Sequence, residues 1–322
     1  MMGTRSRTRM FALAFLAAAS LGLSACSGAA PDSKTALPDV KNLPQGVNEH
    51  PQLPKDSSSD DSCDPLRSYK PSASKSAKEI KAIIKRGRLR VGVDQTTYLM
   101  GYRDPATGKM DGFDVRVARE IAKDLLGDAS KIQFVAMTSA DREPALENHD
   151  VDLVVRTMTI NCDRWKNIGF SGEYYAAAQK VLVPNSSDVK DPESDLKGHK
   201  VCAAKGSTSI NRIKDWGAKP VSVHDWTDCM ILIQQGDVDA MTTDDVILAG
   251  MAAQDPNTHV IDKALSAEPY GVGANKDDVD LIKYVNHTLD RIRKDGTWEK
   301  IYGDTLAKTL GKAKPPKPKY GR

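Results

Sequence analysis

The sequence lacks three features that would each indicate a particular function. Lysine and arginine total 46 and aspartate and glutamate 43, so the net charge is only +3. This argues against a nucleic-acid partner, which usually requires a clustered basic face. No apolar run reaches the roughly 20 residues of a membrane-spanning helix. There is also no nucleophile-elbow signature, and no Cys-x-x-Cys pair or regular Cys/His spacing, so neither a serine-hydrolase site nor a metal site is expected.

The N-terminus has the pattern of an exported protein. Arg5, Arg7 and Arg9 precede the apolar run 10–23, as in a secretory signal peptide. The run ends in Leu-Ser-Ala followed by Cys26, which resembles a bacterial lipobox. The resemblance implies that residues 1–25 are a lipoprotein signal peptide and that the sulfur of Cys26 carries lipid. Ordinary secretion, with an incidental cysteine, is the alternative.

Two segments have the composition of exposed chain. Residues 26–76 are rich in Ser, Asp, Pro and Lys and have no periodic apolar pattern. Such a segment cannot bury enough apolar surface to offset its chain entropy. We therefore expect a lipidated cysteine followed by a flexible linker. Residues 313–322 form a basic, Pro-rich tail, for which we expect solvation rather than contact with anionic lipid.

The remaining cysteines are Cys63, Cys162, Cys202 and Cys229. An even number in an exported chain favours two disulfides, with three possible pairings. Four free, buried thiols are the alternative.

The body of the chain alternates apolar strand patterns with helical patterns, which is typical of α/β proteins with mostly parallel sheets. Asp114 has the residue type and position of a helix N-cap. Ligands of such folds bind beyond the carboxyl ends of the strands. The predicted strands are 89–93, 132–137, 151–158, 180–183, 200–204, 221–224, 239–242 and 259–261, and the predicted helices after the one at Asp114 are 140–148, 208–216, 227–235, 245–253 and 278–294.

Three of these strand ends carry residues suited to a zwitterion. Thr157 and Thr159 offer hydroxyl and N–H groups, and Arg164 offers a planar fork for a carboxylate. The turn 206–209, Gly-Ser-Thr-Ser, presents N–H groups at a predicted helix start. Asp244 places a carboxylate where an ammonium group would bind. Each feature alone is more often a solvated salt bridge or a helix cap.

The order of five motifs along the chain is more specific. They are GFDV at 112–115, VDL through the arginine at 151–164, FSGEYY at 170–175, PYGV at 269–272 and DGTWEKIY at 295–302. Together they resemble the bacterial extracellular solute-binding proteins of family 3, which bind polar amino acids for ABC transporters. The resemblance covers about residues 79–304. It is nearest to actinobacterial glutamate- and glutamine-binding lipoproteins.

The resemblance implies a two-lobe, type II periplasmic-binding-protein-like α/β fold, in which helices flank a mostly parallel sheet in each lobe. Lobe 1 would be residues 77–181 plus 270–312, and lobe 2 residues 182–269. Cys202 and Cys229 then fall in one lobe, which favours their pairing and leaves Cys63 to pair with Cys162. It also implies a monomer on the extracellular face of the membrane, with no enzyme activity and no cofactor. The partners would be an L-amino acid and the permease of an ABC transporter.

By the same resemblance, Arg164 binds the α-carboxylate and Asp244 the α-ammonium group. Thr157, Thr159, Ser207 and Thr208 supply further hydrogen bonds. The segment 161–163, Asn-Cys-Asp, departs from the family pattern, and a longer loop after the first strand leaves Tyr98 and Tyr102 as candidates for an aromatic cover.

Arg156 directs the choice of ligand. If its side chain faces the cleft, its buried charge requires an anion, and glutamate or aspartate would supply one. If it pairs with a protein carboxylate instead, glutamine or asparagine remains the rival. A sensor subunit for a membrane receptor is a second alternative. An enzyme on this fold, with Glu173 or His224 as acid or base, is a third.

Overall fold

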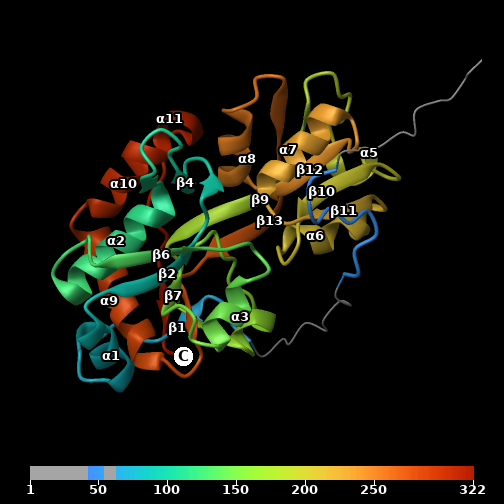
Figure 1. Ribbon diagram of the computed structural model, residues 1–322. Coiled ribbons are helices and arrows are strands. Elements are labelled where there is room, and N and C mark those ends of the chain that lie inside the picture. The colour runs from blue at the N-terminus through green and yellow to red at the C-terminus, as the bar shows by residue number, and fades with distance from the viewer. Residues whose placement is uncertain (1–42, 54–62) are drawn as a thin grey trace, which may run out of the picture. The chain divides into compact units, whose positions relative to one another are not determined.

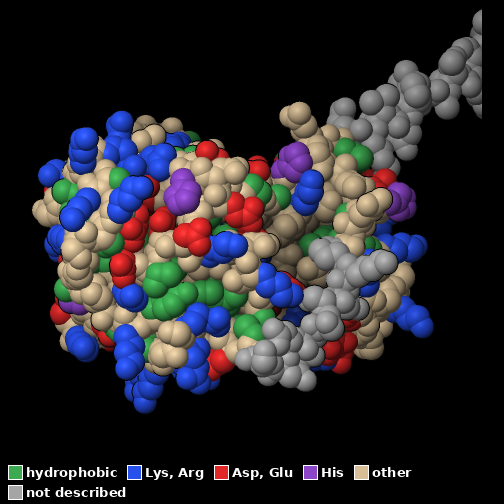
Figure 2. Space-filling model, turned by 90° about the horizontal axis from the view of Figure 1, so that it is seen from below, with side chains coloured by type: hydrophobic (Ala, Val, Ile, Leu, Met, Phe, Trp, Pro, Cys, Tyr) green, Lys and Arg blue, Asp and Glu red, His purple; other side chains and the backbone are tan. Residues whose placement is uncertain are grey.

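The computed structural model describes residues 43–53 and 63–322, and residues 43–322 belong to one unit. The predicted signal peptide, Cys26 and most of the predicted linker lie outside the described residues. No helix in the described part of the chain is long and apolar enough to cross a membrane. On the face in Figure 2, Lys and Arg side chains are interspersed with Asp and Glu, in keeping with the small net charge.

The first five-stranded sheet has the order β6-β2-β7-β14-β8. Strand β2 is parallel to β6 and β7, whereas β14 is antiparallel to β7 and β8. The apolar side chains of β2 are buried because helices cover the sheet. The strands are β2 (Leu89–Val93), β6 (Ile132–Ala136), β7 (Leu153–Val154), β8 (Ile168–Phe170) and β14 (Gly273–Asn275), and the helices of this lobe are α1 (Lys78–Arg86), α2 (Phe113–Leu126), α3 (Arg142–Glu147), α4 (Cys162–Trp165), α9 (Val279–Lys294), α10 (Thr297–Thr305) and α11 (Ala307–Leu310).

The second five-stranded sheet, β11-β10-β12-β9-β13, repeats this arrangement. Strand β10 is parallel to its two neighbours, and β9 is antiparallel to both β12 and β13. Strands β2, β6 and β7 share one direction, and so do β10, β11 and β12. The carboxyl ends of these strands therefore lie at one edge of each sheet. The elements are β9 (Tyr175–Pro184), β10 (Lys200–Ala204), β11 (Lys219–Val223), β12 (Ala240–Asp244), β13 (Thr258–Tyr270), α5 (Pro192–Asp195), α6 (Ser209–Arg212), the 3₁₀ turn Ile213–Trp216, α7 (Trp226–Gln235) and α8 (Asp245–Ala252).

Two long strands join the lobes. The chain leaves the first sheet after β8, enters the second through β9, and returns through β13 to β14 (Figure 1). β9 and β13 pair antiparallel from Tyr175 opposite Tyr270 to Pro184 opposite Thr258, with an irregularity between Ile261 and Ser266. A small sheet of β3 (Thr96–Thr97), β4 (Gly101–Arg103) and β5 (Met110–Asp111) follows β2.

Each sheet is mixed, because one strand, β14 or β9, runs antiparallel to the other four, which share one direction. Two sequence predictions need correction. The strand predicted at 151–158 is reduced to β7, because Thr157 has a left-handed φ of 39° that ends the extended backbone. Helix α2 is preceded by Gly112, at φ 124°, not capped by Asp114. A Cβ on Gly112 would lie 2.3 Å from the Met100 carbonyl oxygen, so only glycine fits there.

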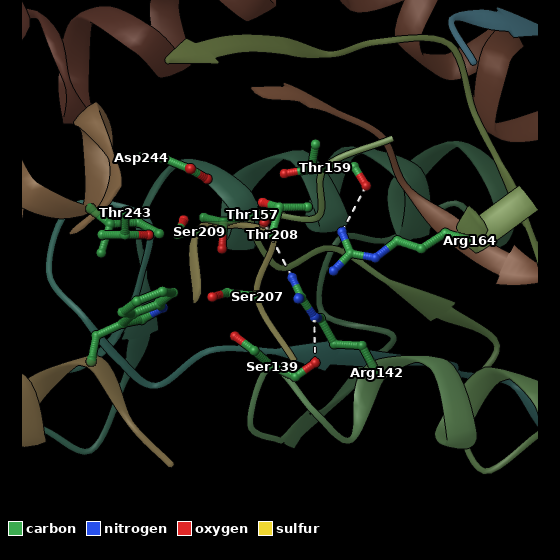
Figure 3. Close-up of a pocket in the computed structure, with 12 residues that line it drawn as sticks. Ser139, Arg142, Thr157, Thr159, Arg164, Ser207, Thr208, Ser209, Thr243 and Asp244 are labelled. Carbon is green, nitrogen blue, oxygen red and sulfur yellow. Dashed lines mark hydrogen bonds between the residues drawn. The ribbon is translucent and has the colours of Figure 1, made fainter. Parts of the chain in front are cut away.

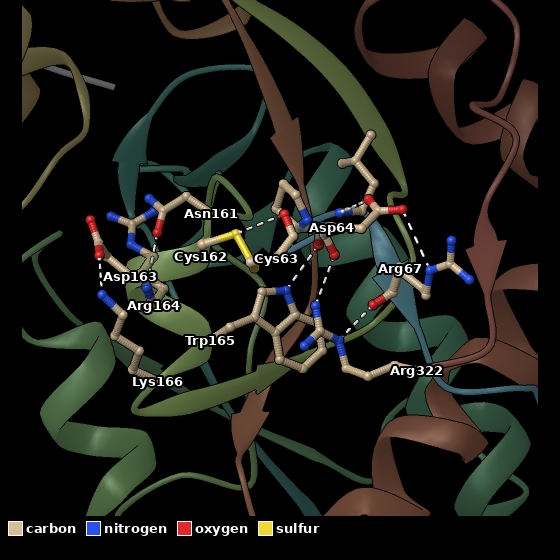
Figure 4. Close-up of a disulfide and its surroundings, with 12 residues drawn as sticks. Cys63, Asp64, Arg67, Asn161, Cys162, Asp163, Arg164, Trp165, Lys166 and Arg322 are labelled. Carbon is tan, nitrogen blue, oxygen red and sulfur yellow. Dashed lines mark hydrogen bonds and ion pairs between the residues drawn. A yellow bond between two sulfur atoms is a disulfide. The ribbon is translucent and has the colours of Figure 1, made fainter. Parts of the chain in front are cut away.

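Parts of the predicted linker and tail contact the body. Asn48 exchanges two backbone hydrogen bonds with Ser222 of β11. Strand β1 (Arg67–Ser68) pairs in parallel with β15 (Lys319–Tyr320) in the C-terminal tail, and Arg322 lies over the ring of Trp165 (Figure 4). Composition indicated exposed chain, but these contacts depend on partners distant in sequence. The described ends of these segments therefore form part of the fold.

The structure holds the disulfides Cys202–Cys229 and Cys63–Cys162. The first joins β10 to α7 within the second lobe. The second joins the end of the predicted linker to the first residue of α4 (Figure 4). Closing loops of this length stabilises a fold by about 3–5 kcal/mol on the chain-entropy model. The second bridge also fixes the helix that carries Arg164.

Candidate functional site

A pocket lies between the two lobes, at the ends of five strands. Arg142 and Arg164 lie on one side of it, and Thr243 and Asp244 lie on the other (Figure 3). The lining residues are Ser139, Arg142, Thr157, Thr159, Arg164, Ser207, Thr208, Ser209, Trp226, Thr243, Asp244 and Ile247.

Six of the nine predicted ligand-binding residues line this pocket, namely Thr157, Thr159, Arg164, Ser207, Thr208 and Asp244. Arg156, Tyr98 and Tyr102 do not. Neither Glu173 nor His224, the acid or base candidates of the enzyme alternative, is among the lining residues. The described residues contain no group of three or more His, Cys, Asp or Glu side chains that would hold a metal ion.

Arg164 is held with its terminal nitrogens in position for an anion. Asn161 caps α4 by accepting from the backbone N–H of Arg164, and Glu143 accepts from its Nε at 3.1 Å. Its Nη1 donates to the Thr159 carbonyl oxygen at 2.7 Å, and Nη2 to the Gly206 carbonyl oxygen at 3.1 Å. Each terminal nitrogen has two N–H bonds, so one at each remains for a ligand. Burial lowers the pKa of Arg164 despite Glu143.

Arg142 was not identified from the sequence. Its guanidinium is buried and donates to the carbonyl oxygens of Ser139, Arg156, Thr157 and Gly206 at 2.9–3.2 Å. It forms no ion pair with the described carboxylates. Burial lowers its pKa well below the usual range, and the nearby charge of Arg164 adds to this effect. Its position shortly after the strand predicted at 132–137 could have indicated it.

Arg156 does not face the cleft, and the prediction that its charge requires an anionic ligand was wrong. Its side chain is fully buried, and its Nη2 lies 2.6 Å from Oδ2 of Asp94 as an ion pair, although the two atoms are not aligned as a hydrogen bond. Nε donates to the Met137 carbonyl oxygen and Nη1 to the Ser139 hydroxyl. The protein itself supplies the counter-charge. Arg156 therefore positions Ser139, which does line the pocket.

Asp244 has one carboxylate oxygen occupied and one unpaired. Oδ2 accepts from the Tyr270 hydroxyl at 2.6 Å, whereas Oδ1 is buried without a hydrogen-bond partner among the described residues. Burial raises the pKa of Asp244 well above its usual range, and the neighbouring Glu268 carboxylate raises it further. An unsatisfied buried acceptor of this kind costs about 1–3 kcal/mol. A cationic group bound in the pocket would satisfy it and restore the ionised form.

The two lobes are bonded to each other at the pocket. Arg142 and Arg164 of the first lobe both donate to the carbonyl oxygen of Gly206 in the second. Oε2 of Glu268, on the crossing strand β13, accepts from the hydroxyls of Thr159 and Thr208 at 2.8 Å each. These bonds link residues of both lobes to the crossing strand, so the position of the lobes and the geometry of the pocket depend on each other.

Asp114 holds the backbone of Thr157, which lines the pocket. Its Oδ2 accepts from the backbone N–H of Thr157, and its Oδ1 from the Tyr174 hydroxyl, at 2.8 and 2.7 Å. The first bond fixes the left-handed backbone of Thr157, which is costly for a β-branched residue. Burial raises the pKa of Asp114 to about 7.

The aromatic cover differs from the prediction. Tyr98 and Tyr102 contact each other edge to face, and Tyr98 is 39% exposed. They follow β2 in the small sheet and lie outside the pocket lining. The aromatic residue that lines the pocket is Trp226, the first residue of α7.

Replacing Arg156 with Ala should destabilise the fold by about 3–5 kcal/mol, because it leaves the Asp94 carboxylate buried without its partner. Urea unfolding measures the loss. The double variant Asp94→Ala/Arg156→Ala should lose less than the sum of the two single variants. If Arg156→Ala were as stable as the wild type, the pair would not be a buried structural contact.

Replacing Asp114 with Asn should change how stability depends on pH. The folded pKa of about 7 lies above the ordinary aspartate value of 3.8, so folding is favoured when this carboxyl is protonated. The wild type should lose stability relative to Asp114→Asn as pH rises from about 4 to about 7, by an amount on the order of 4 kcal/mol. Unfolding curves of both proteins across this range test it. A constant difference between the curves would contradict the raised pKa.

Comparison with known proteins agrees with this architecture. Residues 89–306 match the family described as bacterial extracellular solute-binding proteins, family 3. The ABC transporter glutamine-binding protein GlnH of Bacillus subtilis is 38% identical over 71% of this chain and 86% of its own length. The glutamate-binding protein GluB of Corynebacterium glutamicum is 32% identical over 70% of this chain and 80% of its own.

A solved structure, a solute receptor for L-cysteine of Neisseria gonorrhoeae, superposes with a TM-score of 0.69 at 29% identity. It covers 72% of this chain and 95% of the receptor. The fold is thus that of the type II periplasmic binding proteins, α/β with mixed sheets flanked by helices. With a pocket between two lobes and a family match over most of its length, the chain belongs to family 3 of the bacterial extracellular solute-binding proteins.

Proposed function

We propose that the protein captures an acidic amino acid, glutamate or aspartate, in this pocket and delivers it to an ABC transporter. The acidic assignment rests on the environment of Arg142. It is a buried guanidinium in the pocket wall, and its four acceptors are all backbone carbonyl oxygens.

The α-groups of the ligand have complementary partners on the two lobes. The remaining N–H bonds of Arg164 suit a bidentate carboxylate, and Thr159 and Ser207 also line the pocket. The unpaired Oδ1 of Asp244 suits an ammonium group. An L-amino acid thus pairs its negative end with the first lobe and its positive end with the second.

This assignment leaves Arg142 for the side chain of the ligand. Carbonyl dipoles stabilise a buried guanidinium less than a carboxylate does, because a charge-assisted bond is roughly twice as strong as a neutral one. The charges of Arg164 and Arg156 lower its pKa, and those of Glu143 and Asp244 offset this only in part. A second carboxylate in the pocket would offset this repulsion. Glutamate and aspartate supply it, whereas a neutral side chain does not.

Binding is coupled to lobe closure in this proposal. A ligand that contacts Arg164 on one lobe and Asp244 on the other binds the closed arrangement better than an open one. It therefore shifts the population toward the closed form. The closed form is the one that a permease would recognise, and no covalent step is involved.

Glutamine is the second candidate ligand. It is favoured by the identity of 38% with the glutamine-binding relative, against 32% with the glutamate-binding one. The ion pair of Arg156 with Asp94 also removes the reason for which Arg156 was first assigned to an acidic ligand. The amide would contact the same α-group partners but would bring no carboxylate to Arg142.

Calorimetric titration with glutamate, aspartate, glutamine and asparagine tests the ligand assignment. We expect the two acids to bind more tightly than the amides in the wild type. Arg142→Met should weaken glutamate at least tenfold more than glutamine, because it removes a charge-assisted contact worth about 1.5–3 kcal/mol. Arg116→Met is the charge-matched control, since Arg116 pairs with Asp111 and Asp304 away from the pocket.

Three outcomes would count against the acidic assignment. Tighter binding of glutamine, or an equal loss of both ligands in Arg142→Met, would favour the amide. Failure of the wild type to bind any of the four would overturn the proposed function and reopen the enzyme alternative. If binding holds but the protein captures a signalling protein instead of a permease, the sensor alternative is favoured.

The proposal includes a lipid anchor on the extracellular face of the membrane. It rests on the lipobox-like segment that ends at Cys26, beyond the described residues. Replacing Cys26 with Ser should release the protein from the membrane fraction into the medium of its bacterial host, because the sulfur that would carry the lipid is gone. Cell fractionation measures this release. Retention of the Cys26→Ser protein in the membrane fraction would contradict the anchor.

A further inference from the structure

Three buried polar atoms in the pocket have no hydrogen-bond partner among the described residues. They are Oδ1 of Asp244, Nε1 of Trp226 and the hydroxyl oxygen of Thr243. The proposed function uses Asp244. The other two come from the second lobe, at the start of α7 and near the end of β12. Unpaired buried groups are rare in native proteins, and each requires an explanation.

The indole of Trp226 contrasts with two other tryptophans of the protein. Nε1 of Trp298 donates to the Tyr174 carbonyl oxygen at 2.8 Å, and Nε1 of Trp165 to the Pro65 carbonyl oxygen at 2.9 Å. Trp226 is only 2% exposed, so its indole is shielded from bulk solvent. A buried tryptophan normally finds a partner for its N–H. Trp226 is also one of the residues that line the pocket.

The neighbouring threonine shows the same contrast. The hydroxyl of Thr242 donates to the Lys180 carbonyl oxygen and accepts from Gln179. Thr243, one residue further, is 1% exposed and lines the pocket with its hydroxyl unpaired. Strand alternation places the two side chains on opposite sides of β12. Only the one that faces the pocket lacks a partner.

We propose that the Trp226 indole N–H and the Thr243 hydroxyl form a side-chain subsite that hydrogen-bonds the terminal oxygen of the ligand. This assignment rests on the proposed function, because it names further contacts to the same ligand. An indole N–H is a donor only, and a hydroxyl adapts as donor or acceptor. The group that reaches them must therefore present an acceptor oxygen.

The subsite discriminates by leaving its donor unsatisfied with the wrong ligand. An aliphatic side chain provides no acceptor, and an ammonium or guanidinium group presents donors to a donor beside two arginines. A site whose buried polar groups go unpaired rejects such analogues strongly. A carboxylate satisfies Arg142 through one oxygen and this subsite through the other. A glutamine amide would satisfy the subsite through its carbonyl oxygen.

Isosteric variants test the subsite. Trp226→Phe keeps an aromatic ring without the N–H, and Thr243→Val keeps the shape without the hydroxyl. Each should weaken glutamate about 10- to 100-fold, as expected for one hydrogen bond to a charged acceptor. Norvaline, which has the same backbone and no terminal oxygen, should change less than threefold when measured by competition. Thr243→Ser should bind glutamate within about threefold of the wild type, because it restores the hydroxyl.

Unchanged glutamate binding in Trp226→Phe and Thr243→Val would overturn the subsite while the proposed function stands. An equal loss of glutamate and norvaline would also overturn it, because the residues would then act by packing. Lack of binding by the wild type would overturn the proposed function itself. If Trp226→Phe does not fold, the indole ¹H–¹⁵N resonance of Trp226 in the wild type decides. It should move downfield with glutamate but not with norvaline, and an unmoved resonance overturns the subsite.

Discussion

Three buried guanidinium groups, Arg142, Arg156 and Arg164, are the constraint on which this site depends. A buried charge is tolerated only when it is paired or fully hydrogen-bonded. Arg156 meets this condition within the protein, through Asp94. Arg164 meets it in part, through Glu143 and two carbonyl oxygens. Arg142 has carbonyl oxygens alone. Because Arg164 and Arg142 are incompletely paired within the protein, their guanidinium groups favour an anion in the pocket.

These charges also connect the pocket to the relative position of the lobes. The Gly206 carbonyl oxygen accepts from Arg142 and Arg164 across the cleft, and a Cβ on Gly206 would lie 2.7 Å from Cα of Ala140. This close approach requires glycine at the turn. Glu268 joins the crossing strand to a threonine of each lobe. A ligand that competes for these groups therefore acts on the closure of the lobes as well as on its own binding.

The fold and much of the site were predictable from the sequence because both follow from strand ends. Thr159, Arg164, Ser207 and Asp244 each come shortly after an apolar strand, and parallel strands bring such positions together. The partner of Arg156 was not predictable in the same way. Asp94 lies 62 residues earlier, and only the register of β2 against β7, with Gly92 opposite Val154, places it beside Arg156. Arg142 and Trp226 were not predicted because the first falls inside the expected helix 140–148 and the second immediately before the expected helix 227–235, where neither residue type by itself indicates a ligand contact. The docked tail was not predicted because composition does not reveal distant pairing partners.

The central claim is that one lobe holds the α-carboxylate and the other the α-ammonium group of the ligand. Titration of the wild type with glutamate, glutarate and 4-aminobutyrate tests it most directly, because the two analogues each lack one α-group. The account predicts that both analogues bind at least 100-fold more weakly than glutamate, since either leaves a charged protein group unpaired. Glutarate binding as tightly as glutamate would show that Asp244 does not bind an ammonium group, and would contradict the account.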